Sequence, residues 1–303
     1  MPPDDQAKIR GADAPRQVPS RTARLAPGLY VVATPIGNLS DITLRALDTL
    51  AAADLVLCED TRVTRKLLER YSVKASLMAY HDHNADTVRP RVLAKLAEGA
   101  AIALVSDAGT PLVSDPGYKL VAAALQAGQR VFPVPGASAV LAALVAAGLP
   151  SDRFLFNGYL PAKSGQRRAR IEELAAIPAT LILYETGPRL AASLADLAAI
   201  LGGRPASVCR ELTKLFEETR RGTLAELAAH YATAGRPKGE IVIVIGPPEQ
   251  HVPDAEDLDA RLEAALARSS LKDAVASVAA ETGLKRKQVY ARALALAGKG
   301  AKR

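Results

Sequence analysis

The chain has 303 residues, with 39 lysines and arginines against 32 aspartates and glutamates, for a formal net charge of +7. The excess lies at one end, because the last nineteen residues hold seven basic residues and no acidic one. The other 284 residues carry 32 charges of each sign, so the body is formally neutral and a globally cationic protein is excluded.

A hydrophobic content of 49% is enough for a sizeable core, which excludes disorder for most of the chain. No apolar run approaches the ~20 residues that span a bilayer, and residues 1–27 hold no apolar signal segment. The two cysteines, Cys58 and Cys209, do not make a disulfide framework. A cytoplasmic protein is therefore expected.

The first 27 residues are rich in proline and charge, and they predict a flexible extension. A transit peptide is the weaker alternative, because such peptides are poor in acids.

From residue 29 short apolar segments alternate with amphipathic ones, and Asp41 is predicted to cap a helix that runs to about Ala52. This alternation predicts a mostly parallel sheet covered by helices. The strands expected there are residues 29–33, 55–58, 101–105 and 130–134.

A second α/β segment begins near Arg153, after a join at residues 149–152. Beyond residue 254 there is no strand pattern, only three helical stretches. We therefore expect α/β domains at 28–150 and 151–247, a linker at 248–256 and a basic helical module at 257–303. The strands expected in the second domain are residues 154–158, 179–184, 206–210 and 240–245.

The common nucleotide-binding signatures are absent, since no G-x-G-x-x-G follows the first strand and no P-loop occurs anywhere. Nicotinamide and P-loop enzymes are thereby disfavoured. A hydrolase elbow at Ser138 fails because Val140 replaces its second glycine. His81 and His83 could share a strand face, but no cysteine or third histidine lies nearby in the sequence, so no metal site is expected.

Three turns rich in glycine and proline follow predicted strands, at residues 34–38, 106–111 and 133–138. In open α/β sheets ligands bind beyond the carboxyl ends of the strands. Glycine lets the backbone approach a ligand closely, and proline stiffens the turn. Any one of these could be an ordinary turn, but three in one domain favour a ligand-binding cleft.

At residues 29–41 the segment LYVVATPIGNLSD resembles the opening of the tetrapyrrole methylase superfamily and, within it, of the branch that methylates 16S rRNA. The resemblance covers about residues 28–300. It continues through CEDTR at 58–62, YHDHN at 80–84, SDAGTPLVSDPG at 106–117, PVPGAS at 133–138, FNGYLP at 156–161, YET at 184–186 and CRELTK at 209–214.

The resemblance implies a two-domain tetrapyrrole methylase-like α/β fold (class III of the S-adenosylmethionine methyltransferases), with a small all-helical C-terminal helix-turn-helix module. It implies S-adenosyl-L-methionine in the cleft between the domains and no metal. The implied reaction is 2′-O-methylation of a decoding-centre cytidine in the 16S rRNA of the small ribosomal subunit. A homodimer is also expected.

Cofactor-binding residues follow from the matched motifs, although many contacts in this superfamily are made by the main chain. For Ser138 the alternative is a plain helix cap, and for Tyr184 and Cys209 it is strand-end packing. The residues implied are Pro35 under the methionine part, Asp107, Gly109, Thr110 and Val113 along the second turn, Ser138 and Ala139 at a helix start, and Tyr184, Cys209, Glu211 and Gly239 towards the adenosine.

Catalysis requires alignment of a ribose oxygen with an already electrophilic methyl group, together with an acceptor for the hydroxyl proton. The candidates on the cleft side are Glu59, Asp60, Arg62 and His81. A carboxylate could take the proton, and Arg62 could hold a phosphate. Helix caps or surface ion pairs are the alternative for each, and the sequence does not single out the base.

Two basic groups predict contacts with RNA phosphates. One is expected in a loop leading into a helix, and consists of Lys163, Arg167, Arg168 and Arg170. The other decorates the second helix of a predicted helix-turn-helix (residues 271–281, 282–284 and 285–296), and consists of Lys285, Arg286, Lys287 and Arg292. Ala279, Gly283 and Val289 have helix-turn-helix spacing. A solvated face and a packing or dimerisation module are the respective alternatives.

Two other functions stay open at this point. A methylase of the same superfamily that acts on a tetrapyrrole precursor would not need the basic terminal module. A noncatalytic RNA-binding protein would not need a cofactor cleft.

Overall fold

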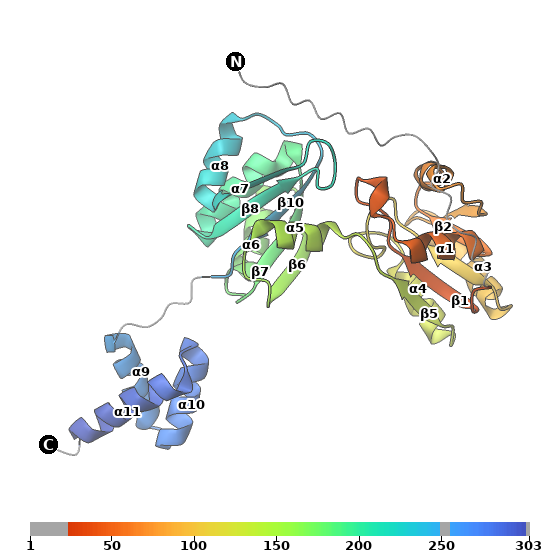
Figure 1. Ribbon diagram of the computed structural model, residues 1–303. Helices are drawn as coiled ribbons and strands as arrows, with labels where there is room; N and C mark the ends of the chain where they lie inside the picture. The colour runs from red at the N-terminus through yellow and green to blue at the C-terminus, as the bar shows by residue number, and fades with distance from the viewer. Residues whose placement is uncertain (1–23, 249–254, 301–303) are drawn as a thin grey trace, which may run out of the picture. The chain divides into compact units, whose positions relative to one another are not determined.

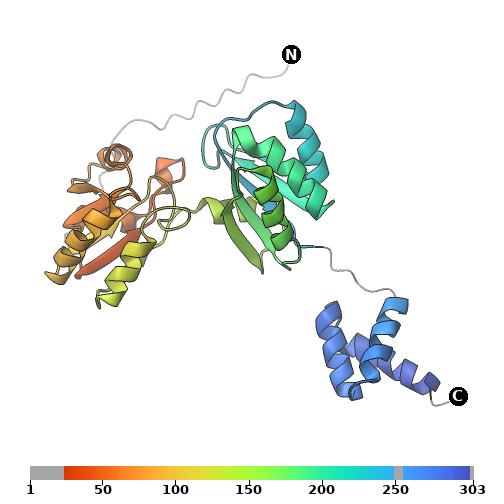
Figure 2. The ribbon, with the colours of Figure 1, turned by 180° about the vertical axis from the view of Figure 1, so that it is seen from behind.

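The computed structural model describes residues 24–248 and 255–300. Contacts group the chain into two compact units, one up to Pro247 and one from Pro248 (Figures 1 and 2). Most of the predicted N-terminal extension and of the linker lies outside the described residues, as do Lys302 and Arg303. The expected domain limits inside the first unit stay a prediction.

The first sheet has five strands in the order β3-β2-β4-β1-β5, and every neighbouring pair is parallel. This agrees with the βα alternation in the sequence. The strands are β1 Gly28–Val32, β2 Leu55–Cys58, β3 Leu77–Ala79, β4 Ala101–Leu104 and β5 Val131–Val134. The helices between them are η1 Leu39–Asp41, α1 Leu44–Ala52, α2 Thr61–Arg70, α3 Ala85–Ala97 and α4 Tyr118–Gln126.

Helices cover both faces of this sheet because its central strands are apolar at every position. Successive side chains of a strand point to opposite faces. Leu55 and Leu57 of β2 therefore pack with α3 and α4, whereas Val56 and Cys58 pack with α1 and α2. The result is a doubly wound layer whose strand ends converge at one edge.

Two local expectations were wrong. Asp41 does not begin the first helix, because it closes the short η1, and α1 is capped by Thr43, whose side chain accepts from the Ala46 N–H at 3.1 Å. The strand expected to carry His81 and His83 ends at Ala79, and both histidines follow in the turn before α3.

The second sheet is mixed, in the order β6-β7-β10-β8-β9, with only β6 and β7 parallel. Its strands are β6 Phe154–Tyr159, β7 Thr180–Thr186, β8 Pro205–Arg210, β9 Glu218–Thr223 and β10 Glu240–Ile245. The accompanying helices are α5 Ala139–Ala147, α6 Ser164–Ala175, α7 Gly187–Leu201 and α8 Leu224–Thr233.

Strand β10 divides the second core by its alternation. Ile241, Ile243 and Ile245 face α6, α7 and α8, whereas Val242 and Val244 face α5. Helix α5 follows β5 in the chain and yet packs on the second sheet, so the chain crosses between the sheets at the turn that precedes Ala139.

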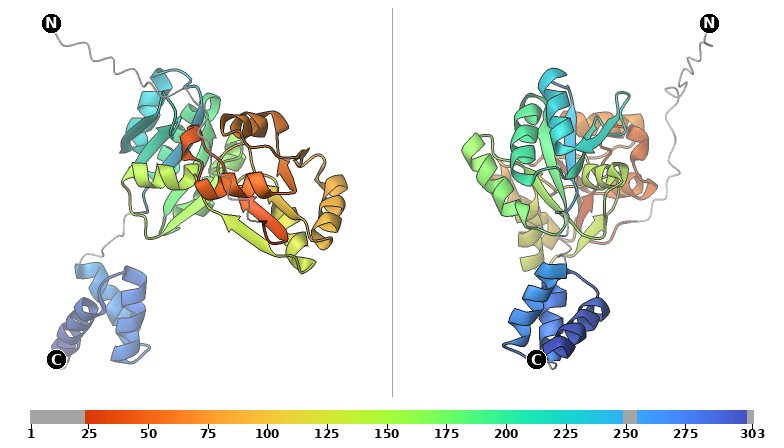
Figure 3. Two further views of the ribbon diagram at one scale, coloured as in Figure 1. Left: turned by 45° about the vertical axis from the view of Figure 1, so that its right-hand side comes forward. Right: turned by 90° about the vertical axis from the view of Figure 1, so that its left-hand side faces the viewer.

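The C-terminal unit has three described helices, α9 Ala255–Leu266, α10 Leu271–Thr282 and α11 Arg286–Gly300 (Figure 3). Ser270 caps α10, and Gly283 ends it at φ +69°, a left-handed conformation that favours glycine. Val289 is fully buried with Val275 and Leu262, and Ala279 packs against them. Gly283 therefore lies in the turn and Val289 in the core of this unit, as the helix-turn-helix spacing predicts.

In the part of the chain that the structure describes, no helix is both long and apolar enough to cross a membrane. Within the same residues, no group of three or more His, Cys, Asp or Glu side chains is arranged to hold a metal ion.

Candidate active site

The three predicted turns meet at the carboxyl edge of the first sheet. Thr34 and Gly109 exchange both backbone hydrogen bonds, at 2.8 and 3.1 Å. The Thr110 hydroxyl donates to the Ala137 carbonyl at 3.2 Å, which ties the second turn to the third. Gly109 has φ +78°, and a Cβ there would lie 3.3 Å from Ile36 Cγ2, so the close approach requires a glycine.

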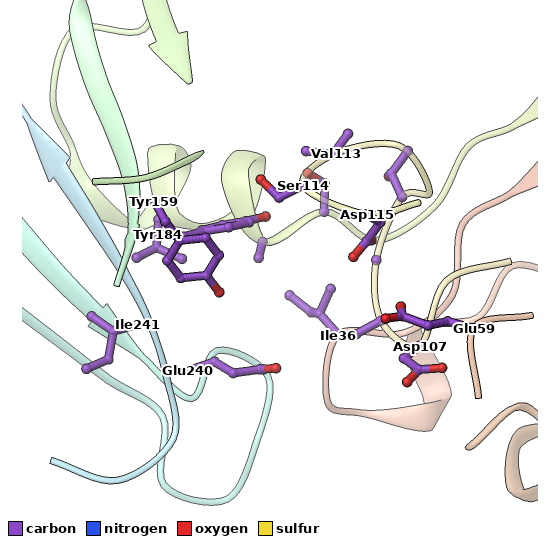
Figure 4. A pocket seen from close by; sticks show the side chains of 16 residues that line it. Ile36, Glu59, Asp107, Val113, Ser114, Asp115, Tyr159, Tyr184, Glu240 and Ile241 are labelled. Carbon is purple, nitrogen blue, oxygen red and sulfur yellow. The ribbon is translucent and has the colours of Figure 1, made fainter. Parts of the chain in front are cut away.

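These turns and the second sheet enclose a cavity of about 300 Å³ (Figure 4). Of the predicted residues, Asp107, Gly109, Thr110, Val113, Ser138, Ala139, Tyr184 and Glu59 line it. Pro35 lines an adjacent cavity that shares Ile36 and Asp107. Ser138 also caps α5, with its hydroxyl 3.5 Å from the Leu141 N–H, so the cap alternative and the cavity position hold together.

The cavity is acidic. Glu59, Asp107, Asp115 and Glu240 line it, and none of its lining residues, all within the described chain, is basic. Burial, followed by repulsion from Asp107, raises the pKa of Glu59. Burial, together with repulsion from Glu59, Asp107 and Glu240, raises the pKa of Asp115 to about 6, although a hydrogen bond with Ser106 opposes this. Such a cavity suits a cation.

Aromatic rings form the opposite wall of the cavity (Figure 4). Tyr184 packs against Phe156 with ring centroids 4.8 Å apart, and against Tyr159 at 5.5 Å. Burial raises the pKa of Tyr184 to about 12, so its phenol stays protonated at neutral pH. Tyr184 thus lies at the cavity and also packs at a strand end.

The loop that carries Asp115 has a strained backbone. Leu112 and Ser114 adopt φ values of +75° and +64°, in the left-handed region that non-glycine residues rarely occupy. Gly117, at φ +124°, ends the loop, and a Cβ there would lie 2.8 Å from Leu104 Cδ2. Backbone strain of this kind collects at functional sites, where the surrounding structure holds it in place.

Besides Pro35, three predicted cofactor residues do not line the cavity. Cys209 is fully buried beneath α5, with its Sγ 3.9 Å from the Ala143 carbonyl oxygen, so its side chain belongs to the core. Glu211 pairs with Lys214 at 2.8 Å and accepts from the Glu240 N–H at 3.1 Å. Gly239 leaves room for that carboxylate, since a Cβ would lie 2.3 Å from Glu211 Oε1. Glu211 and Gly239 therefore act on the cavity only through Glu240.

Of the four catalytic candidates, only Glu59 lines the cavity. Asp60 caps α2 by accepting from the Arg62 N–H at 2.8 Å, and it pairs with the Arg62 guanidinium at 2.6 Å. The hydrogen bonds from Arg62 lower the pKa of Asp60 to about 2, so it is a poor proton acceptor at neutral pH. His81 lies outside the cavity lining, and its Nδ1 is buried with no partner among the described residues.

The first basic group lies in helix α6 and not in a loop. Arg167 is only 6% exposed and pairs with Asp196, so it is not available to a phosphate. Arg168 shares Asp196, and Arg170 pairs with Glu173 at 2.6 Å. Lys163 is exposed at the start of α6. The basic group at α6 is therefore largely engaged by acids.

The terminal basic group is more exposed than the basic group at α6. Lys285, Arg286 and Lys287 are exposed at the start of α11. Arg292 is held instead by Asp259 of α9 in a two-pronged ion pair, with both contacts at 2.6 Å. Arg292 thus joins two helices of its own unit.

Sequence reasoning missed several lining residues. Ser114, Asp115 and Tyr159 stand inside the quoted motifs at 106–117 and 156–161, and a search of those motifs for acids and aromatics would have found them. Glu240 and Ile241 had no such signal, because a strand start says nothing about the pairing that brings β10 beside β7.

Known proteins share this arrangement. The profile of the Tetrapyrrole (Corrin/Porphyrin) Methylases matches residues 28–228, and that of the RsmI C-terminal HTH domain matches residues 252–297. "Ribosomal RNA small subunit methyltransferase I" of Mesorhizobium japonicum is 55% identical over 92% of this chain and 95% of its own length. The protein of that name from Erythrobacter litoralis is 54% identical over 90% and 96%.

Solved structures share the fold. The uroporphyrin-III-C-methyltransferase of Thermus thermophilus superposes with a TM-score of 0.53, at 23% identity, over 73% of this chain and 94% of that one. With the sequence matches, which span both units, the chain belongs to the tetrapyrrole methylase family and, within it, to the ribosomal RNA small subunit methyltransferase I group.

Proposed function

We propose that this chain transfers a methyl group from S-adenosylmethionine to the ribose 2′-oxygen of a decoding-centre cytidine in 16S rRNA, within the small ribosomal subunit in the cytoplasm. The single observation that carries the proposal is the acidic, tyrosine-walled cavity built by the three turns. The group membership supplies the reaction class, and the exposed basic start of α11 supports an RNA partner.

The cavity residues fit S-adenosylmethionine by their chemistry. A sulfonium and an ammonium need negative surroundings, and Glu59, Asp107 and Asp115 provide them, whereas Glu240 is paired with Lys214 at 2.9 Å. Ala108 and Ala139 line the cavity with small side chains, which leaves room for main-chain recognition. Tyr184 and Tyr159 offer ring surface for an aromatic group.

When bound, the cofactor supplies an electrophilic methyl group. The residues of the chain then have two tasks, namely holding the ribose in line and accepting its proton. Glu59 is the one predicted catalytic residue that lines the cavity. The next residue, Asp60, pairs with Arg62, and its backbone N–H donates to the Asp107 carboxylate at 3.0 Å. Asp60 and Arg62 therefore act as positioning residues.

The cofactor proposal is tested by calorimetry with S-adenosylmethionine. We expect saturable binding that weakens at least tenfold in Asp107→Asn. The matched control is Asp152→Asn, an exposed acid at the join between the sheets. A well-folded wild type that shows no binding would overturn the proposal.

The rRNA proposal is tested by mass mapping of 16S rRNA from a strain that lacks the protein. We expect one decoding-centre cytidine to lose a methyl group, and the purified protein to restore it on isolated small subunits. An unchanged cytidine would remove the rRNA assignment and leave the small-molecule alternative.

We further infer a homodimer. Helix α5 exposes Leu141 at 52% and Val145 at 83%, one helical turn apart on one face. An apolar helix stripe of this kind marks an interface. Light scattering of Val145→Lys should give a monomer if this face joins two copies, and an unchanged dimer would place the interface elsewhere.

A further inference from the structure

Another cavity, of about 330 Å³, is lined by residues 115–117 of the loop 112–117. It is distinct from the cavity at Pro35 and is called the second cavity below. The turn before α3 and the start of α4 form its other walls. Asp115 lines both cavities, and it is the only residue common to the two linings. A ligand in the second cavity therefore reaches the acidic cavity at the Asp115 carboxyl group.

The walls of the second cavity carry groups for each part of a nucleotide. Lys119 is exposed, and its ammonium suits a phosphate. Arg89 of α3 is already engaged, since it pairs with Asp86 at 2.8 Å and a side-chain hydrogen bond with Tyr80 raises its pKa. Lys119 is therefore the cation of this lining that a phosphate would meet, and Arg89 offsets the nearby carboxylates of Asp82 and Asp86. Helix α4 starts at Gly117 with no side-chain cap, so its first N–H groups also favour an anion.

Tyr118 supplies the aromatic surface. It is 72% exposed although it is a large ring at the first position of α4. Exposed aromatic rings are the platforms on which proteins stack unpaired RNA bases. Among the residues that line the second cavity, Tyr80 is the other aromatic, and it is buried. Tyr118 is thus the ring that a base would meet.

We propose that the second cavity receives the target nucleotide, with its phosphate on Lys119 and its base on Tyr118, and that Asp115 accepts the proton of the ribose 2′-hydroxyl. This rests on the proposed function and names the substrate site and the base that the sequence left open. It differs from Glu59, which lines only the acidic cavity.

The ribose oxygen forms a bond to the methyl carbon while the carbon–sulfur bond breaks and its electron pair stays on sulfur. The hydroxyl proton passes to a carboxylate oxygen of Asp115, and water takes it up after release. The products are the methyl ether, a neutral thioether and the protonated carboxyl group, so no other reactant is needed.

The raised pKa of Asp115 agrees with this role, since an acceptor that titrates near the working pH is the most effective. Charged and titratable groups surround it from every neighbouring element. They are Glu59 after β2, Asp82 before α3, Asp86 and Arg89 on α3, Asp107 after β4, Lys119 on α4, Glu240 on β10, Tyr159 on β6 and Tyr184 on β7.

The experiment uses the full chain, S-adenosylmethionine and small subunits from the deletion strain. With both ligands saturating, Asp115→Asn should lower the single-turnover rate about 10²- to 10⁴-fold. Its affinity for S-adenosylmethionine should change less than tenfold. A rate within threefold of the wild type would overturn the assignment of Asp115, as would a loss of rate that saturating cofactor restores.

The nucleotide site is tested separately with Tyr118→Ala and Lys119→Gln. Each should raise the KM for small subunits about five- to tenfold and leave the affinity for S-adenosylmethionine unchanged. Lys95→Gln, an exposed lysine on α3 away from the cavity, is the matched control. If all three variants behave alike, the site is wrong. If the wild type transfers no methyl group at all, the proposed function is wrong. If the wild type is active and only the variants fail to show the expected effect, the nucleotide site alone is wrong.

Discussion

Arg167 and Asp196 form a buried ion pair that ties α6 to α7, with 2.7 Å between the guanidinium and the carboxylate and side chains that are 7% and 13% exposed. Arg167→Ala would leave the carboxylate of Asp196 with only the more exposed Arg168 as its charged partner. We therefore expect it to lower the free energy of unfolding by about 1.5–3 kcal/mol, as for the loss of a charged hydrogen bond. Chemical denaturation measures the loss.

The exposed neighbour Lys163 is the control for this prediction, because Lys163→Ala removes a charge at the start of the same helix without opening the core. Its effect on stability should stay below about 0.5 kcal/mol. If Arg167→Ala instead kept full stability and lost RNA affinity, the guanidinium would be an RNA contact after all.

Asp115 should make the fold less stable as the pH rises. Its pKa lies at about 6 in the folded chain against an ordinary value of 3.8, so between these values the folded state binds the proton that the unfolded state has lost. The protonated Asp115 carboxyl group therefore contributes stability that is fully present below pH ~4 and is lost as the pH rises through ~6. We expect Asp115→Asn, which stays neutral, to be more stable than the wild type by about 1–3 kcal/mol at pH 8.

Denaturation curves at pH 4 and pH 8 check this. The two proteins should be close at pH 4 and differ at pH 8. A difference that does not change with pH would mean that Asp115 is ionised with an ordinary pKa.

The strands that could be predicted are those whose apolar composition fits a buried strand and no other element. β2 and β10 begin and end where the sequence placed them, because uninterrupted runs of Val, Ile and Leu between polar turns suit only buried strands. β3 is three residues long, and β9, with the sequence ETRRGT, is a polar edge strand. The apolar run of β3 is too short to predict a strand and β9 has no apolar run, so pairing with β2 and with β8 is what makes them strands.

The candidate site was predictable where the backbone makes it. The three turns were identified by their glycines and prolines, whose conformational limits are local properties. The burial of the Cys209 side chain could not be predicted, because the face that a strand residue presents depends on register. It lies opposite Val242 on the face that α5 covers, and no local pattern reports which helix covers a face. The left-handed backbone of Leu112 and Ser114 could not be predicted either, because no local sequence pattern indicates it.

Gly109 offers a direct test of the close turn. Gly109→Ala places a side chain at φ +78° and 3.3 Å from Ile36, so the turn that pairs with Thr34 must shift. We expect a loss of about 1–2 kcal/mol of stability. We also expect calorimetry to show at least tenfold weaker binding of S-adenosylmethionine.

The control for this change is Gly128→Ala, which has a similar φ of +72° but nothing within 4 Å of the added Cβ. It carries the same backbone cost without crowding a cavity. Equal loss of cofactor binding in the two variants would show that Gly109 acts through general stability and not through the turn.

The basic start of α11 should govern the salt dependence of subunit binding. Lys285, Arg286 and Lys287 are exposed, and each phosphate contact that they make releases counterions. Replacing all three with glutamine should therefore reduce the slope of log affinity against log salt by about two to three, while cofactor affinity stays unchanged. Arg268→Gln with Lys272→Gln, exposed charges in another turn of the same unit, is the matched control.

Removing residues 248–303 should reproduce and exceed this effect. The first unit is compact by itself, so we expect the shortened chain to keep its affinity for S-adenosylmethionine and to lose most of its affinity for the small subunit. Equal loss of both affinities would contradict this, because it would mean that the helical unit supports the fold of the first unit. A salt slope unchanged by the triple replacement would move the RNA contacts to another surface, and Lys163 on α6 would then be the next residue to replace.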